Sequence, residues 1–213
     1  MEDDWRFDDD VEWHANANAS EDPGSSKKWR TRESDEGTFV SARDSIARAR
    51  YAIDVPSGWE ELVDVASARV VGVDASWRDG NDLASTLAVF VKVDERRRTV
   101  REKYGTIEED ARRRAESAQN QRTLAKRVGT IAYRGRALET HEIETEVGAG
   151  SAGRFGSAIE VARVFIVPAE ANGGDGGWEV FVRATASGSS WRRVQAQLRQ
   201  AVESFRFVDD GGG

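Results

Sequence analysis

The side chains that most often carry enzyme chemistry are scarce in this sequence. It contains two histidines and no cysteine, which excludes disulfides and thiolate metal sites. A nucleophilic serine or threonine needs a neighbouring base, and neither histidine is placed to serve as one. His14 lies in an acidic N-terminal segment, and His141 alternates with Ile143 and Val147 along a predicted strand. We therefore predict that His141 is packed and hydrogen-bonded, and that the protein is not an enzyme.

A glycine pattern is the next candidate for chemistry. Residues 148–153 spell GxGxxG, the pattern of a dinucleotide-binding loop. In such a loop a strand leads in and a helix leaves, with the helix N-terminus directed at the phosphates. Here the residues that follow, up to Val167, are rich in β-branched side chains and predict a strand instead. We interpret the glycines as a flexible loop and predict no tightly bound cofactor.

Two runs of three arginines are the strongest basic clusters. In the run at 112–114 each arginine follows an acidic residue by four positions, a spacing that favours ion pairs along a helix. The three pairs are Glu108/Arg112, Glu109/Arg113 and Asp110/Arg114. That run is therefore predicted to be neutralised within its own helix. The other run consists of Arg96, Arg97 and Arg98 and has fewer acidic neighbours, so we predict that it contacts an acidic partner surface.

The first 38 residues carry the acidity of the chain. They hold twelve acidic and five basic residues, a balance of −7 that equals the net charge of all 213 residues. The neutral remainder gives no reason to expect nucleic-acid binding. The composition of residues 1–38 predicts disorder. Its three tryptophans, Trp5, Trp13 and Trp29, either anchor a partner protein or fold back onto the domain, and both interpretations remain open.

The chain from residue 39 to 208 shows the periodicities of one folded domain, followed by a Gly-rich tail at 209–213. Alternation predicts strands at 51–55, 70–73, 86–93, 141–147, 159–167 and 178–186. The strand at 159–167 is apolar on both faces and is predicted to be central. It forms a long hairpin with the strand at 178–186. Glutamates alternate with apolar residues at 141–147, so we expect that glutamate face to lie in water.

Two stretches have the period of amphipathic helices. Residues 107–127 carry a narrow stripe of small apolar side chains. Residues 191–204 follow a candidate N-cap at Ser189 or Ser190, and their apolar stripe consists of Trp191, Val194, Leu198, Ala201 and Phe205. Strands in runs, rather than in strict alternation with helices, predict a mostly antiparallel sheet flanked by helices. The predicted fold class is α+β, arranged as an α/β/α sandwich.

Taken in order, several segments of this domain resemble the PsbP family. They are YAIDVPSGWEEL (51–62), VVGVDASWRD (70–79), STLAVFVKV (85–93), YGTIEEDARR (104–113), YRGRALETHEIE (133–144) and WEVFVRATASGSSWRRVQAQLRQAVESFRF (178–207). The last is the strongest match, because its strand, Trp-led helix and Ser-Phe ending follow the family's order. The chain departs from the family at Thr106, where proline is common, and at Ala137 and Leu138, near which a tyrosine pair is common. Its acidic N-terminal segment also differs from the family's usual N-terminal arm.

The resemblance implies a PsbP-like domain and a non-catalytic extrinsic subunit of photosystem II in the chloroplast thylakoid lumen. It implies attachment to the membrane through protein partners, namely lumenal subunits of photosystem II or another thylakoid complex. The implied role is to retain calcium and chloride at the oxygen-evolving complex or to assist photosystem assembly, with calcium as the one ligand suggested. The alternative is a divergent PsbP-domain interaction module outside photosystem II. The acidic N-terminus shows no apolar run of a cleavable signal, so the compartment rests on the resemblance.

Overall fold

The described part of the chain forms two antiparallel sheets and three helices. The computed structural model describes residues 29–33, 50–62, 72–94, 99–117, 121–148, 157–168 and 177–208, the first range by its backbone alone. In these residues the large sheet has the strand order β3 (Trp59–Glu61), β4 (Val73–Asp79), β5 (Asp82–Asp94), β9 (Gly177–Ser187), β8 (Ala158–Val167), β7 (Arg136–Val147) and β6 (Gln121–Tyr133). The small sheet has the order β1 (Trp29–Glu33), β2 (Arg50–Pro56) and β10 (Arg206–Val208). The helices are α2 (Val100–Tyr104), α3 (Ile107–Ser117) and α4 (Trp191–Ser204).

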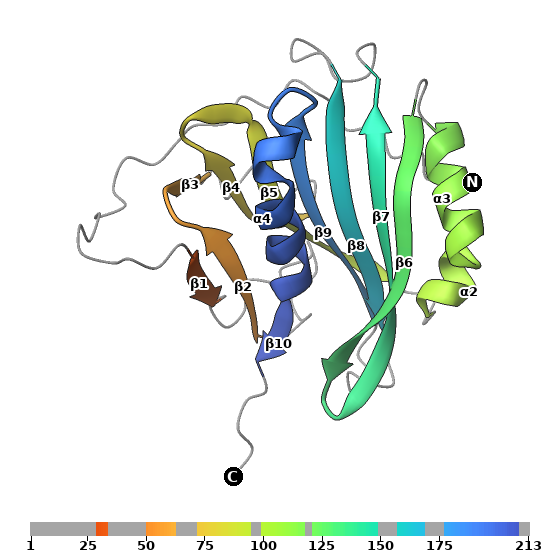
Figure 1. The fold of residues 1–213 in the computed structure, drawn as a ribbon. Coiled ribbons are helices and arrows are strands. Elements are labelled where there is room, and N and C mark those ends of the chain that lie inside the picture. Colours follow the sequence, from red (N-terminus) through yellow and green to blue (C-terminus); the bar gives the residue numbers. More distant parts are fainter. Residues whose placement is uncertain are drawn as a thin grey trace.

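The helices cover opposite faces of the large sheet. Helix α4 lies against β9, β8 and β2, whereas α3 lies against β6 and β7, and α2 against β7 and β8. Figure 1 shows α4 in front of the large sheet and α3 beside β6. On β7, where side chains alternate between faces, His141 reaches Asp110 of α3 and Glu144 reaches Arg199 of α4. The predicted fold class, a mostly antiparallel sheet flanked by helices, is therefore confirmed.

The main core lies between the large sheet and the layer made by α4 and the small sheet. The stripe predicted for the last helix faces this core, and all of its members are buried: Trp191, Val194, Leu198, Ala201 and Phe205. The Phe205 ring stacks on Tyr51 of β2 with centroids 4.9 Å apart, and lies 5.5 Å from the ring of Phe165 on β8. Aromatic contacts of this kind add to the burial of apolar area. One residue therefore joins both sheets at the end of α4.

The predicted hairpin between 159–167 and 178–186 is confirmed. Strands β8 and β9 pair antiparallel from Ala158 opposite Ser187 to Val167 opposite Trp178, and they lie at the centre of the large sheet. Residues 159–167 are apolar on both faces, as expected of a strand that is covered on both sides, whereas apolar and polar residues alternate along 178–186.

A residue from a hairpin distant in sequence contacts the N-terminal end of α4. Ser190 occupies the N-cap position, but its side chain makes no capping bond to the helix. Instead it hydrogen-bonds Asp82, which follows the β4–β5 turn and lies 3.6 Å from Arg193. Burial raises the pKa of Asp82, but the bonds from Ser190, Ser85 and Ala84 outweigh burial and hold the pKa below its usual value. The carboxylate also lies at the positive end of the helix dipole, where a negative charge is favourable.

The helix predicted over 107–127 is wrong in its second half. Helix α3 ends at Ser117, and residues 121–133 form strand β6. This strand pairs antiparallel with β7 through the turn at Arg134 and Gly135, both of which have positive φ. Alanine, lysine and arginine favour a helix by only tenths of a kcal/mol each, so the ladder with β7 decides the structure. Residues 70 and 71 of the strand predicted at 70–73 lie outside the described residues, and β4 runs from Val73 to Asp79.

Leu198 tests the contribution of α4 to the core. The side chain is fully buried, so Leu198→Ala leaves a cavity and is expected to lower the free energy of unfolding by about 3 kcal/mol. Urea unfolding at constant temperature measures this value. Gln200→Ala, on the exposed side of the same helix, is the matched control and should change stability by less than about 0.5 kcal/mol. Equal effects from the two variants would contradict the packing described above.

Candidate functional site

The residues predicted to bind a partner lie mostly outside the described part of the chain. This applies to Trp5, Trp13, Arg96, Arg97 and Arg98 and to residues 149–153 of the glycine pattern. Trp29 begins strand β1, of which only the backbone is described. Strand β1 pairs antiparallel with β2, Trp29 opposite Pro56. Residues 29–33 of the predicted N-terminal segment are thus a strand of the small sheet, and the binding roles stay predictions.

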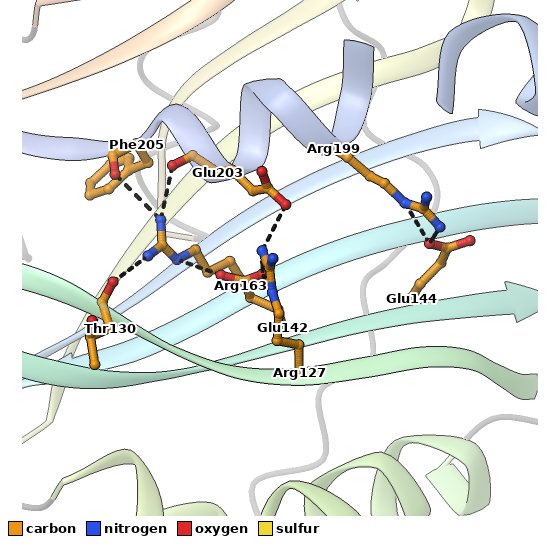
Figure 2. A network of polar contacts seen from close by, with 8 residues as sticks. All are labelled: Arg127, Thr130, Glu142, Glu144, Arg163, Arg199, Glu203 and Phe205. Carbon is orange, nitrogen blue, oxygen red and sulfur yellow. Dashed lines mark hydrogen bonds and ion pairs between the residues drawn. The ribbon is translucent and has the colours of Figure 1, made fainter. Parts of the chain in front are cut away.

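A buried arginine organises the polar groups between the large sheet and α4. Arg163 on β8 is 6% exposed, and its Nε lies 3.2 Å from Oε1 of Glu142 on β7. Its Nη1 donates to the carbonyl oxygens of Glu203 (3.1 Å) and Phe205 (3.5 Å), and its Nη2 donates to the carbonyl of Thr130 (2.9 Å). Figure 2 shows this side chain extended between β6 and the end of α4. Arg163 therefore neutralises Glu142 and satisfies carbonyl groups that the helix end leaves without intrahelical partners.

Two further arginines extend this network along the same face. Arg127 on β6 bonds Glu142 and also reaches Oε1 of Glu203 at 2.7 Å. Arg199 on α4 donates from Nε to Oε2 of Glu144 at 2.9 Å, as Figure 2 shows. The expectation that the glutamate face of 141–147 lies in water is wrong, since Glu144 is only 6% exposed. Helix α4 covers that face and supplies the cation that makes burial of the carboxylate tolerable.

On the opposite face, α3 is tied to the sheet through a buried histidine. Nδ1 of His141 lies 2.9 Å from Oδ2 of Asp110, and Oδ1 of Asp110 accepts from Nε of Arg114 at 2.9 Å. Because a carboxylate only accepts hydrogen bonds, the Nδ1 atom carries the proton. His141 is fully buried, which confirms the prediction of a packed, hydrogen-bonded residue.

Only one of the three ion pairs predicted within α3 forms, namely Asp110 with Arg114. Glu109 instead accepts from the backbone N–H of Thr106 at 2.8 Å, while the Thr106 hydroxyl accepts from the N–H of Glu109 at 3.3 Å. That reciprocal pair is a capping box at the helix start. Glu108 turns toward Lys126 of β6, 3.5 Å away. The sequence spacing paired Glu108 and Glu109 with arginines, but one contacts a neighbouring strand and the other caps the helix N-terminus.

Helix α2 is held to the centre of the sheet by a second buried cluster. Nζ of Lys103 lies 3.2 Å from Asp94 of β5 and 2.7 Å from Glu179 of β9. The hydroxyl of Tyr104 donates to the same Glu179. Burial and the neighbouring Glu179 carboxylate raise the pKa of Tyr104 well above its usual value, so the phenol keeps its proton and remains a donor. This cluster is a structural support for α2.

These polar groups fix elements in place, and their geometry does not converge on one reactive point. The charged residues described above each bond a partner on a neighbouring strand or helix. Within the residues that the structure describes, no three potential metal ligands from His, Cys, Asp or Glu come together. None of the helices in that part of the chain has the length and apolar character needed to cross a membrane.

The exposed apolar side chains of the described residues suggest where a partner could contact the folded domain. The large ones are Leu83, Leu124 and Val128. Two of them lie on β6, which is the edge strand of the large sheet as far as the chain is described. An edge strand presents backbone donors and acceptors to other chains. Sequence reasoning missed this surface because it assigned residues 107–127, Leu124 among them, to a helix.

Comparison with known proteins identifies the fold. No family model matches the sequence, and no curated protein matches it. Among solved structures, the domain has the fold of PsbP. It is similar to cyanobacterial PsbP (CyanoP) from Synechocystis sp. PCC 6803, with a TM-score of 0.54 and 17% identity over 91% of this chain and 100% of that chain. LpqN of Mycobacterium tuberculosis, described as involved in cell envelope biogenesis, matches with a TM-score of 0.49 and 8% identity over 85% of this chain and 92% of that chain; this likeness is too remote to bear on function.

The arginine at the centre of the α4 face has a measurable effect on stability. Arg163→Met removes the cation beside Glu142 and the donors to three carbonyl groups, and is expected to lower the free energy of unfolding by about 3 kcal/mol. The matched control is Arg122→Met, because Arg122 pairs with Glu146 at the exposed margin of the same sheet. That variant should change stability by less than about 1 kcal/mol. Urea unfolding of both variants decides the matter, and similar losses would show that burial of Arg163 is unimportant.

Asp110 is expected to make the free energy of unfolding fall at acidic pH. Burial raises the pKa of Asp110, but the bonds from His141 and Arg114 outweigh burial and leave that pKa below its usual value. The unfolded chain then binds a proton more readily, so this contribution is present at neutral pH and is lost as pH falls from about 5 through the folded-state pKa. We expect wild type to lose stability more steeply than Asp110→Asn between about pH 5 and pH 2, measured by urea unfolding. Parallel curves would rule out this role.

Proposed function

We propose that this chain is a non-catalytic accessory protein of the PsbP type that docks on the lumenal side of photosystem II. The observation that carries the proposal is the fold, which matches cyanobacterial PsbP over the full length of that protein. The sequence segments that resemble the family occur in the same order along the chain and include the whole of α4. In this role the protein lies in the thylakoid lumen, is held by protein partners, and helps retain calcium and chloride or assists assembly.

The distribution of charge supports docking rather than catalysis. The charged residues on both faces of the large sheet are committed to contacts between strands and helices, as with Arg163 and Glu142 or Lys103 and Glu179. The candidates for partner contact are the run at Arg96–Arg98, the N-terminal segment and the edge strand β6. Attachment through exposed charges is sensitive to salt.

A second candidate function is an interaction module on a different complex, docked by its N-terminal segment. The observation that favours it is the composition of residues 1–28, where acidic residues surround Trp5 and Trp13. This acidic segment directly precedes strand β1 in the sequence. Protein interfaces commonly combine a few aromatic anchor residues with charged residues at the rim.

Fractionation tests the compartment and the mode of attachment. We expect the native protein to sediment with thylakoid membranes in about 0.1 M salt and to be released by about 1 M salt, because the screening length falls from about 10 Å to about 3 Å. Immunoblots of the washed membranes and of the supernatant measure this. A native protein present only in a soluble fraction without plastid markers would contradict the proposal.

Rebinding to salt-washed membranes separates the two docking modes. The triple variant Arg96→Gln, Arg97→Gln, Arg98→Gln is expected to weaken rebinding about tenfold, or about 1.4 kcal/mol. Deletion of residues 1–28 leaves β1 in place and should preserve rebinding; loss of rebinding here would favour the interaction module. Val128→Lys, on the exposed edge of β6, tests the remaining surface. Circular dichroism confirms that each variant is folded.

A further inference from the structure

Several arginines on the α4 side of the large sheet are more exposed than the carboxylates they pair with. Among the described residues, five pairs share this order: Arg122/Glu146, Arg127/Glu142, Arg193/Asp82, Arg199/Glu144 and Arg206/Asp54. The arginine side chains are 43% to 72% exposed, whereas the acidic side chains are 7% to 36% exposed. In each pair the carboxylate therefore lies deeper and the guanidinium lies toward solvent.

These arginines follow α4 and the strands beside it. Arg193 and Arg199 belong to α4 itself, and Arg127 of β6 reaches Glu203 of the same helix. Figure 2 shows Arg127 and Arg199 beside the carboxylates that they contact. Arg192 is also exposed and has no ion-pair partner among the described residues. We call the five paired arginines together with Arg192 the arginine band.

The carboxylates beneath the band hold its guanidinium groups in place. Arg122 donates to Glu146 from Nε and Nη2, and Arg127 uses the same two atoms toward Glu142 and Glu203. None of these bonds uses Nη1, which carries two further N–H donors in each guanidinium. A side chain that is already ordered loses less conformational entropy when it binds a second group. The ion pairs thus present donors that are fixed before any partner arrives.

The opposite side of the sheet does not share this order. Glu108 of α3 is more exposed than Lys126, with which it pairs, and Glu60 of β3 is more exposed than Arg78. In these two pairs the acid is the outer member. Outward guanidinium groups are therefore a property of the α4 side and not of every ion pair in the domain.

The total charge of this region favours recognition by individual contacts. Seven arginines and six acids make it up, which leaves a charge of +1: Arg122, Arg127, Arg163, Arg192, Arg193, Arg199 and Arg206 with Asp54, Asp82, Glu142, Glu144, Glu146 and Glu203. A nucleic acid or an anionic membrane binds through summed charge, which is small here. A guanidinium instead binds a single carboxylate through directed N–H bonds. Carboxylates at matching positions on a protein fit this region best.

We propose that the arginine band is the docking surface for a carboxylate-rich face of a partner protein. The inference rests on the proposed function, in which protein partners hold this chain at a membrane. Aspartate and glutamate side chains of the partner accept hydrogen bonds from the outer N–H groups of the band. The deeper carboxylates keep their own bonds, so each paired guanidinium lies between one acid of the domain and one of the partner, and α4 stays in place.

Rebinding to salt-washed thylakoid membranes tests the surface with two triple variants. The band variant is Arg122→Gln, Arg192→Gln, Arg193→Gln; Asp82, the deepest acid that it unpairs, keeps its bonds from Ser85 and Ser190. The control is Arg101→Gln, Arg112→Gln, Arg113→Gln, which removes three exposed arginines of α2 and α3 and changes the net charge equally. We expect the band variant to rebind about tenfold more weakly, and the control to lose less than about threefold. Equal losses, or no loss in the band variant, would overturn the inference.

Chemical cross-linking identifies the groups that the band contacts. A carbodiimide joins an amine to a carboxylate that touches it, and Arg192→Lys places an amine in the band. We expect this variant to be cross-linked to an aspartate or glutamate of a membrane protein, located by mass spectrometry. Arg112→Lys, at an exposed position of α3, is the matched control and should give no such product. The same product from both variants, or none from Arg192→Lys, would contradict the inference.

Two further outcomes separate this inference from the proposed function. A wild-type protein that does not rebind thylakoid membranes would refute the proposed function, and the inference would fall with it. A wild-type protein that rebinds as well as its band variant would refute the inference alone. Vesicles of phosphatidylcholine and phosphatidylglycerol in equal parts contain no protein, so we expect no binding to them in a flotation assay. Binding that the band variant abolishes would assign the surface to lipid and overturn the protein partner.

Discussion

The structure depends on how a cation buried within the large sheet is neutralised. Arg163 lies on β8, between β7 and β9, where it is largely buried. It reaches Glu142 across the sheet and the carbonyl groups at the end of α4. This places the end of the helix above β8, brings Phe205 onto Tyr51, and sets β10 beside β2. The contacts that neutralise the buried Arg163 therefore also determine where the small sheet forms.

The helices are held differently on the two faces of the large sheet. On the α4 face, apolar packing dominates and ion pairs border the contact. On the α2 and α3 face, short helices are held mainly by Lys103, Tyr104, Asp110 and His141, each bonded to a neighbouring element. Polar networks of this kind are stable when every member is satisfied.

The sequence predicted the centre of the domain better than its margins. The β8–β9 hairpin and α4 were predictable because their apolar residues repeat with a clear period and little else competes. The region 121–127 was not, because its alanine and lysine residues favour a helix locally, while the partner strand that decides its structure begins at Arg136. Burial of Glu144 was equally hidden, since Arg199 lies 55 residues away. The candidate binding residues Arg96–Arg98 rest on sequence alone, so their role stays a prediction.

The small sheet joins the two ends of the domain. Strand β2 pairs with β10, Ala52 opposite Arg206, so among the described strands one of the first meets the last. During synthesis, β2 can pair with β1 early, but its second partner, β10, exists only once residues 206–208 have left the ribosome. The hairpins β6–β7 and β8–β9 join residues close in sequence and can form early. Completion of the small sheet therefore waits for residues 206–208, and a chain that stops short of residue 206 would expose one edge of β2 and leave its aromatic neighbours without cover.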